Sequence, residues 1–113
     1  MLPKDDLVGV RHMLDATTEA LGYVAGRTRS DLDTDSMLAR ALINCLSVIG
    51  EAAARVRSET QERDAHIPWA QIVGMRNRLI HAYFDIDPDE VWMTVTEDLA
   101  DRAGMWTGEV RVQ

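Results

Sequence analysis

The segment TDSMLARALINCLSVIGEAAARVR, residues 34–57, dominates the fold because its apolar and small side chains occupy two sides of one predicted helix. Residues spaced by three and four predict one buried face, and these are Leu38, Ala41, Leu42, Cys45, Ile49, Ala52 and Val56. A second stripe on the opposite side contains Ile43, Ser47, Gly50 and Ala54. This second stripe fits either a weakly polar surface or close contact with another helix or a second copy of the chain, and the sequence leaves both open.

Three further helices are predicted, separated from each other by polar breaks at 26–30, 58–66 and 85–88. The first runs from about Asp5 to Val24, and its stripe contains Leu7, Val10, Leu14, Thr17, Leu21 and Val24. The third begins with Pro68 in its first turn and runs to about Tyr83. The fourth begins near Pro88, and its core stripe contains Val91, Trp92, Val95, Leu99 and Ala103. The pattern predicts an all-α fold.

Length, charge and cysteine content narrow the class of protein. The 113 residues predict one domain spanning 1–113, with a core at about 5–103 and a tail at 104–113. The net charge of −7 argues against a protein that coats nucleic acid broadly, although a local basic patch remains compatible with it. With Cys45 as the only cysteine, no intrachain disulfide and no cysteine-based zinc site is expected, and Cys45 itself is interpreted as a small core residue.

The N-terminal residues are acidic where a signal peptide needs an apolar run, and we see no continuous apolar stretch of about 18 residues. We therefore expect a cytoplasmic protein with no membrane partner.

An arginine stands in the apolar face of the third helix. At about 100° per residue, Trp69 and Ile80 fall within about 40° of Arg76, and Ile72 and Val73 within about 60°. Burying an unpaired charge is costly. Arg76 must therefore meet a carboxylate or open into a cleft.

Four polar side chains near the end of this helix share an arc of about 160°, and they are Arg76, Asn77, His81 and Tyr83. An imidazole passes protons near neutral pH, and a guanidinium supports negative charge on phosphate oxygens. These groups are suited to RNA cleavage, with two copies in a dimer supplying both a base and an acid. The alternative is structural: an arginine paired with an acid, a histidine near a helix end and a core tyrosine.

The octapeptide RNRLIHAY, residues 76–83, resembles the Arg-x4-His-x-Tyr motif of HEPN-domain ribonuclease toxins, in the HepT-like branch. The surroundings also resemble this family from about residue 5 to 100. Ile67-Pro68-Trp69 opens the motif helix, IGEAA at 49–53 closes the preceding long helix, and Asp85-Ile86-Asp87 leads to Val91-Trp92.

The resemblance implies a bundle of four to five up-and-down helices that forms a homodimer and cleaves RNA without a metal or other cofactor. It implies that Arg76 and His81 are catalytic and that Asn77 supports them. It also implies a partner, an MNT-type nucleotidyltransferase antitoxin, which transfers AMP to the motif tyrosine, here Tyr83. The added phosphate would occupy the position of the RNA backbone and repel substrate.

Two other charged clusters were weighed. Arg55 and Arg57, together with Arg78 of the motif, are candidate RNA-binding residues, and Arg63 and His66 lie nearby. For the loop arginines the sequence favours the other interpretation, a solvated helix end. The acids at 85–90 lack ligand spacing with a histidine, and a helix start accounts for them. No metal site is therefore expected.

Three functions remain in competition at this point. The motif favours a ribonuclease toxin. The acidic net charge leaves room for a non-catalytic module that binds nucleotide or RNA in the same groove. A structural helical partner would hold Arg76 in a two-pronged contact with a carboxylate.

Overall fold

The computed structural model describes residues 4–65, 67–81 and 87–100, with 78–81 described by their backbone alone. Its elements are α1 (Lys4–Val24), α2 (Asp31–Thr34), α3 (Ser36–Arg55), α4 (Ser58–Arg63), α5 (Trp69–His81), α6 (Pro88–Met93) and a π-helix, η1 (Thr94–Leu99). Every regular element in these residues is a helix, which confirms the all-α class.

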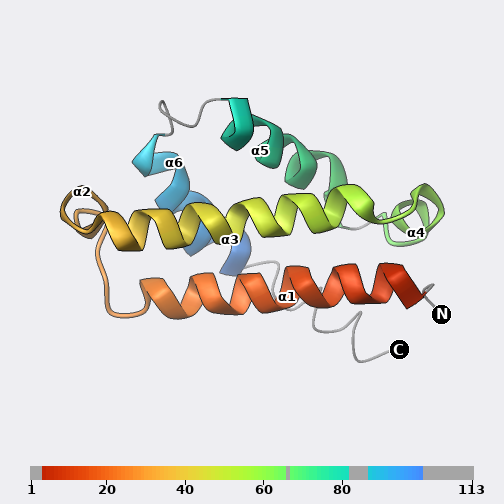
Figure 1. The fold of residues 1–113 in the computed structure, drawn as a ribbon, viewed down its shortest axis with the longest axis horizontal. Coiled ribbons are helices and arrows are strands. Elements are labelled where there is room, and N and C mark those ends of the chain that lie inside the picture. The colour runs from red at the N-terminus through yellow and green to blue at the C-terminus, as the bar shows by residue number, and fades with distance from the viewer. Residues whose placement is uncertain (1–3, 66, 82–86, 101–113) are drawn as a thin grey trace.

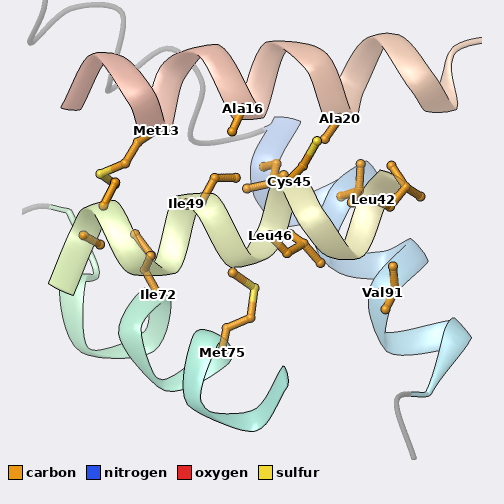
Figure 2. Close-up of a cluster of buried hydrophobic side chains, with 14 of the residues drawn as sticks. Met13, Ala16, Ala20, Leu42, Cys45, Leu46, Ile49, Ile72, Met75 and Val91 are labelled. Carbon is orange, nitrogen blue, oxygen red and sulfur yellow. The ribbon is translucent and has the colours of Figure 1, made fainter. Parts of the chain in front are cut away.

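Helix α3 lies at the centre, with α1 along one side and α5 along the other (Figure 1). Met13, Ala16 and Ala20 of α1 approach α3 from one side, and Ile72 and Met75 of α5 approach from the other (Figure 2). The buried residues of α3 are Leu38, Leu42, Cys45, Leu46, Ile49, Gly50, Ala52 and Ala53. The prediction of a buried Cys45 is confirmed, and burial, followed by the nearby Glu19, raises the pKa of its thiol.

By length and composition alone, α3 could cross a membrane, with a mean hydropathy of 1.4 over its most apolar window. Its place in the fold supplies another reason for that composition. A helix with neighbours on two sides needs two apolar faces.

The predicted helix over 34–57 is interrupted at Asp35 and ends earlier than expected. Thr34 closes α2, and the Asp35 carboxylate accepts the Leu38 N–H at 3.1 Å, so α3 begins at Ser36. Helix α3 ends at Arg55 because Val56 turns to an extended conformation and is buried.

The predicted break at 58–66 contains a helix, α4, which the sequence analysis missed. A buried carboxylate fixes its start: Asp6 of α1 accepts hydrogen bonds from the Thr60 hydroxyl at 2.5 Å and from the Arg57 N–H at 3.3 Å. Because its partner lies more than 50 residues away in the chain, this contact has no local pattern.

The predicted stripe of α1 is partly wrong. Val10 and Thr17 are buried, but Leu7, Leu14, Leu21 and Val24 are only partly so, and Met13, Ala16 and Ala20 complete the buried face. Helix α1 packs against both α3 and η1. Its buried face is therefore rotated toward the line between these two neighbours, where small alanines permit close packing.

The C-terminal helix begins as predicted, with Pro88 in its first turn and the Asp87 carboxylate accepting the Asp89 N–H at 2.9 Å. Val91, Val95 and Leu99 are buried, and Trp92 is partly buried, as predicted. From Thr94 the helix widens into η1. Ala103 and the predicted tail lie outside the described residues.

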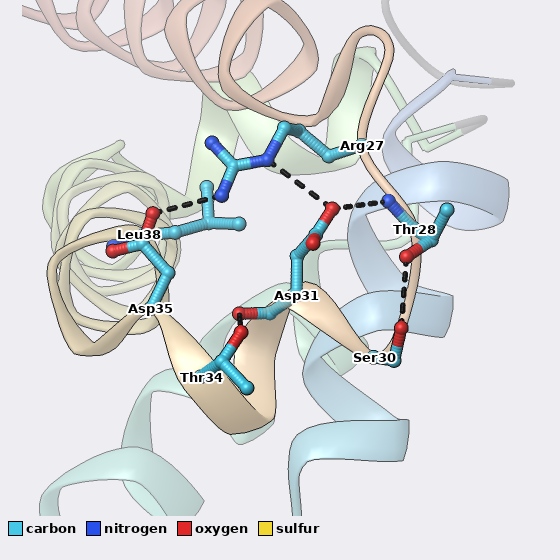
Figure 3. Close-up of polar contacts among 7 residues, drawn as sticks. All are labelled: Arg27, Thr28, Ser30, Asp31, Thr34, Asp35 and Leu38. Carbon is cyan, nitrogen blue, oxygen red and sulfur yellow. Dashed lines mark hydrogen bonds and ion pairs between the residues drawn. The ribbon is translucent and has the colours of Figure 1, made fainter.

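The connection from α1 to α3 is held by charges (Figure 3). Arg27 contacts Asp31 through Nε at 3.2 Å and Asp35 through Nη2 at 2.8 Å. Arg29 pairs with Asp33 of α2 and with Asp89 of α6. The predicted break at 26–30 is therefore an ordered turn that connects three helices, and Gly26 supports it with a positive φ of 74°.

Candidate functional site

The motif helix α5 is anchored at its start. Pro68 immediately precedes it, and the indole Nε1 of Trp69 donates a buried hydrogen bond to the Asp64 carbonyl at 3.2 Å. Trp69, Ile72 and Met75 are buried, and the last two point toward α3 in Figure 2. These three residues, spaced by three, form one face of α5 that packs into the core. Arg76 is the next residue after Met75, the last of the three.

Helix α5 lies very close to α3 where Arg76 meets Gly50. A Cβ atom placed on Gly50 would lie 2.1 Å from the Arg76 Cβ and 2.9 Å from its Cγ. No side chain fits in that space. Of the two interpretations left open for the stripe containing Gly50, helix contact is therefore confirmed at this position, within the chain itself.

The guanidinium of Arg76 has few partners. Its Nη1 donates to the Asn77 amide oxygen at 3.1 Å, and its Nη2 lies 3.9 Å from Oε1 of Glu51. Its Nε is buried and makes no hydrogen bond within the described part of the chain. The side chain is 32% exposed. Arg76 therefore meets a carboxylate loosely, at one nitrogen, and not in the two-pronged contact of a purely structural arginine.

The remaining motif residues are placed only in part. The backbone of α5 is helical through His81, so Arg76 and His81 lie on one continuous helix, as predicted. The side chains of Arg78 and His81 lie outside the described residues, and so does all of Tyr83. Convergence of the guanidinium and the imidazole stays a prediction, as do the roles of these three residues.

Arg55 and Arg57 have different surroundings. Arg55 is exposed and lines a groove of about 350 Å³ between α1 and α3. The groove is lined by Asp5, Val8, Gly9, His12, Val48, Glu51, Ala52 and Arg55. Arg57 is also exposed, and its backbone N–H donates a hydrogen bond to the Asp6 carboxylate. Because Glu51 both lines the groove and approaches Arg76, Arg55 is the better placed of the two for a role near the motif.

Glu51 is the member of the site that sequence reasoning missed. It occurs in the IGEAA run, but nothing in the sequence connects it with a residue 25 positions later. The approach of α5 to Gly50 makes that connection.

The acids before and within α6 have structural partners where they are described. Asp87 caps the helix, and Asp89 pairs with Arg29. Among the side chains that the structure describes, which exclude that of His81, no group of three or more histidine, cysteine or acidic residues could hold a metal ion. Asp85 is outside the described residues.

The protein is a helical bundle, and the Arg76-Asn77 pair of its RNRLIHAY segment lies beside the central helix. These are the features of the HEPN-type class of ribonucleases. The chain matches the family model described as ribonuclease HepT-like over residues 13–103. It belongs to that family.

Relatives of the chain are also named as ribonucleases. The chain is 34% identical over 95 residues to a proposed ribonuclease HepT of Thermococcus cleftensis, covering 80% of this chain and 86% of the relative. It is 32% identical over 92 residues to a proposed RNase of Caldanaerobacter subterraneus subsp. tengcongensis, covering 81% and 82%. It is 31% identical over 87 residues to a proposed RNase of Methanocaldococcus jannaschii, covering 77% and 80%. No solved structure matches significantly. The family assignment makes the protein an enzyme of the ribonuclease class.

Proposed function

We propose that the protein is a metal-independent endoribonuclease that acts in the cytoplasm as the toxin of a toxin–antitoxin pair. The observation that carries the proposal is the partly exposed, loosely paired guanidinium of Arg76, on the same helix as His81. Arginine binds phosphate oxygens through its planar fork, and histidine transfers protons near neutral pH. A site of this kind needs no metal to cleave RNA.

In the proposed reaction, a ribose 2′-oxygen attacks the neighbouring phosphorus and loses its proton to a base. The bond from phosphorus to the 5′-oxygen then breaks, and that oxygen takes a proton from an acid. The products are a 2′,3′-cyclic phosphate and a 5′-hydroxyl. Arg76 stabilises the extra negative charge of the phosphorane, and Asn77 holds Nη1 of the guanidinium. His81 transfers the protons.

The proposed reaction favours a homodimer. Each motif supplies one histidine, whereas the reaction uses a base and an acid at once. A two-fold dimer that places two motifs beside one scissile phosphate supplies both. Light scattering at micromolar concentration should give twice the chain mass, and a monomeric mass would remove the two-histidine mechanism.

The proposed antitoxin is an MNT-type nucleotidyltransferase that transfers AMP to Tyr83. An AMP group next to Arg76 would place a phosphate where the RNA backbone binds and add negative charge. Incubation with the partner and ATP should add the mass of one AMP to the wild-type chain. The addition should be lost in Tyr83→Phe and kept in Tyr23→Phe, which changes the exposed tyrosine of α1. AMP on Tyr23, or none at all, would refute this assignment.

The alternative is a module that binds nucleotide or RNA without cleaving it. The net charge of −7 favours it, because an acidic surface weakens attraction to long RNA. In that case RNA would bind without turnover, Arg76→Ala would abolish binding, and His81→Ala would leave it unchanged.

The experiment that separates these functions is incubation of the purified protein with RNA in EDTA. We expect cleavage that leaves 2′,3′-cyclic phosphate ends and that is lost in His81→Ala. Cleavage that stops with chelator, or that persists in His81→Ala, would overturn the proposed chemistry.

Expression in a bacterium should slow growth only when the nucleotidyltransferase is absent. Equal growth with and without the partner would remove the toxin–antitoxin role.

A further inference from the structure

Two consecutive residues of α3 contact Arg76 in different ways. Gly50 lies against the Cα, Cβ and Cγ of Arg76, so the start of the arginine side chain is fixed by backbone packing. Glu51 presents its carboxylate to the far end, with Oε1 3.9 Å from Nη2. One turn of α3 therefore determines both where the arginine side chain begins and where its charged end lies.

The guanidinium has a polar neighbour at each of its terminal nitrogens. Nη1 donates to Asn77 at 3.1 Å, and Nη2 faces Glu51. Because these nitrogens flank one planar group, the hydrogen bond at Nη1 and the attraction between Nη2 and the carboxylate favour the same orientation of the plane. A phosphate accepts two parallel hydrogen bonds from arginine only when that plane has the correct orientation.

The contact with Glu51 is too weak to be explained as support for the fold. Glu51 is 53% exposed, and ion pairs of that exposure contribute little to stability. At 3.9 Å the carboxylate is also beyond normal hydrogen-bond distance from Nη2. A phosphate oxygen that makes a short, charge-assisted bond can take its place at this nitrogen.

We propose that Glu51 is a positioning residue of the ribonuclease site, which orients the Arg76 guanidinium and gives up Nη2 to the RNA phosphate. This inference rests on the proposed function, since it assigns Glu51 a role in that same site. Glu51 does not touch the reacting atoms. It acts through Arg76, and its own negative charge opposes RNA binding.

The first test is the kinetics of Glu51→Gln, which keeps the size of the side chain and removes its charge. We expect kcat to fall about threefold, because the guanidinium is less well oriented in the transition state but an exposed ion pair contributes only weakly to that orientation. We expect KM to fall by about twofold or more, because repulsion of the RNA phosphate is relieved. Glu97→Gln, the same change at an exposed residue of η1, should alter neither constant.

The second test does not depend on activity. Nitrogen-15 NMR of the Arg76 side chain measures rotation about its Nε–Cζ bond. We expect rotation in Glu51→Gln to be faster than in the wild type by about threefold, as the loss of an exposed ion pair allows, and unchanged in Glu97→Gln.

The two tests separate the possible failures. If the wild type does not cleave RNA, the proposed function fails, and the NMR comparison still decides whether Glu51 orients Arg76. Equal rotation rates in the wild type and Glu51→Gln would overturn the positioning role. An unchanged kcat would overturn it too, whether KM rises, falls or stays the same.

Discussion

Arg27 and Arg76 are almost equally exposed, at 35% and 32%, yet their surroundings differ sharply. Arg27 is bound by two aspartates, at 3.2 Å and 2.8 Å. Arg76 has one carboxylate at 3.9 Å, one neutral amide and a buried Nε without a hydrogen bond among the described residues. The exposed fraction therefore does not distinguish these two arginines. They differ in the number of hydrogen bonds that the guanidinium already makes, and the role proposed for Arg76 rests on that difference.

The contacts of Arg27 also affect the pKa values of the two aspartates that it binds. The hydrogen bond from Arg27 is the main cause that lowers the pKa of Asp35. For Asp31, the Thr28 N–H is the main cause that lowers the pKa, with Arg27 contributing less. These carboxylates hold the connection between α1 and α3 in place. They also accept hydrogen bonds from the guanidinium of Arg27. Arg27 is therefore committed to contacts within the fold, whereas Arg76 is the arginine that we propose as the phosphate ligand.

The largest expected effect is on RNA cleavage by arginine variants. Arg76→Ala should lower kcat/KM by about 100-fold or more, because it removes a charged donor that stabilises the phosphorane. Arg27→Ala should leave the activity of the folded protein close to wild type, because its charge is already neutralised by two aspartates. Initial rates in EDTA, corrected for the folded fraction by circular dichroism, measure both. Similar losses in the two variants would mean that the different hydrogen bonding of Arg27 and Arg76 has no bearing on cleavage.

The next effect is on stability, through the contact that places Arg76. Gly50→Ala should lower the free energy of unfolding by about 1–3 kcal/mol, because the new methyl group would overlap the Arg76 Cβ. Gly74→Ala is the matched control on α5. A Cβ there meets nothing within 4 Å, and a helical glycine replaced by alanine gains up to about 1 kcal/mol.

Urea unfolding of both glycine variants measures these changes. If Gly50→Ala were as stable as Gly74→Ala, the close approach of α5 to α3 would be wrong, and the position of Arg76 with it.

The smallest effect is the acid dependence of stability. Because the pKa values of Asp31 and Asp35 are lowered in the fold, the unfolded chain binds more protons than the folded chain does as the pH falls. Their contribution is present above the ordinary aspartate pKa and is lost as the pH drops through the lowered values. Arg27→Gln should therefore flatten the fall in stability between about pH 5 and pH 2. Urea titrations across this range measure the slope, and an unchanged slope would remove the role of this cluster.

Local patterns predict much of this molecule, and long-range contacts account for what they miss. Helical spacing identified the bounds of α1 and most of the core of α3, and Pro88 identified the start of α6. Helix α4 was missed because a buried Asp6 from the other end of the chain fixes it. A helical wheel cannot supply the rotation of α1, which depends on where α3 and η1 lie.

The candidate site shows the same division. Arg76 and Asn77 were predicted from their order in the motif and their place on one helix. Glu51 was not, because its contact with Arg76 depends on the register between α3 and α5. That register is determined by the absence of a side chain at Gly50.

The central claim is that Arg76, and not Arg27, is free to bind a phosphate. Titration of the nitrogen-15-labelled protein with 2′-O-methyl RNA tests it directly, because this RNA offers phosphates but lacks the attacking hydroxyl. We predict that the Nε–H signal of Arg76 shifts in proportion to bound RNA while that of Arg27 stays in place. An unmoved Arg76 signal, or equal shifts at both arginines, would contradict the account.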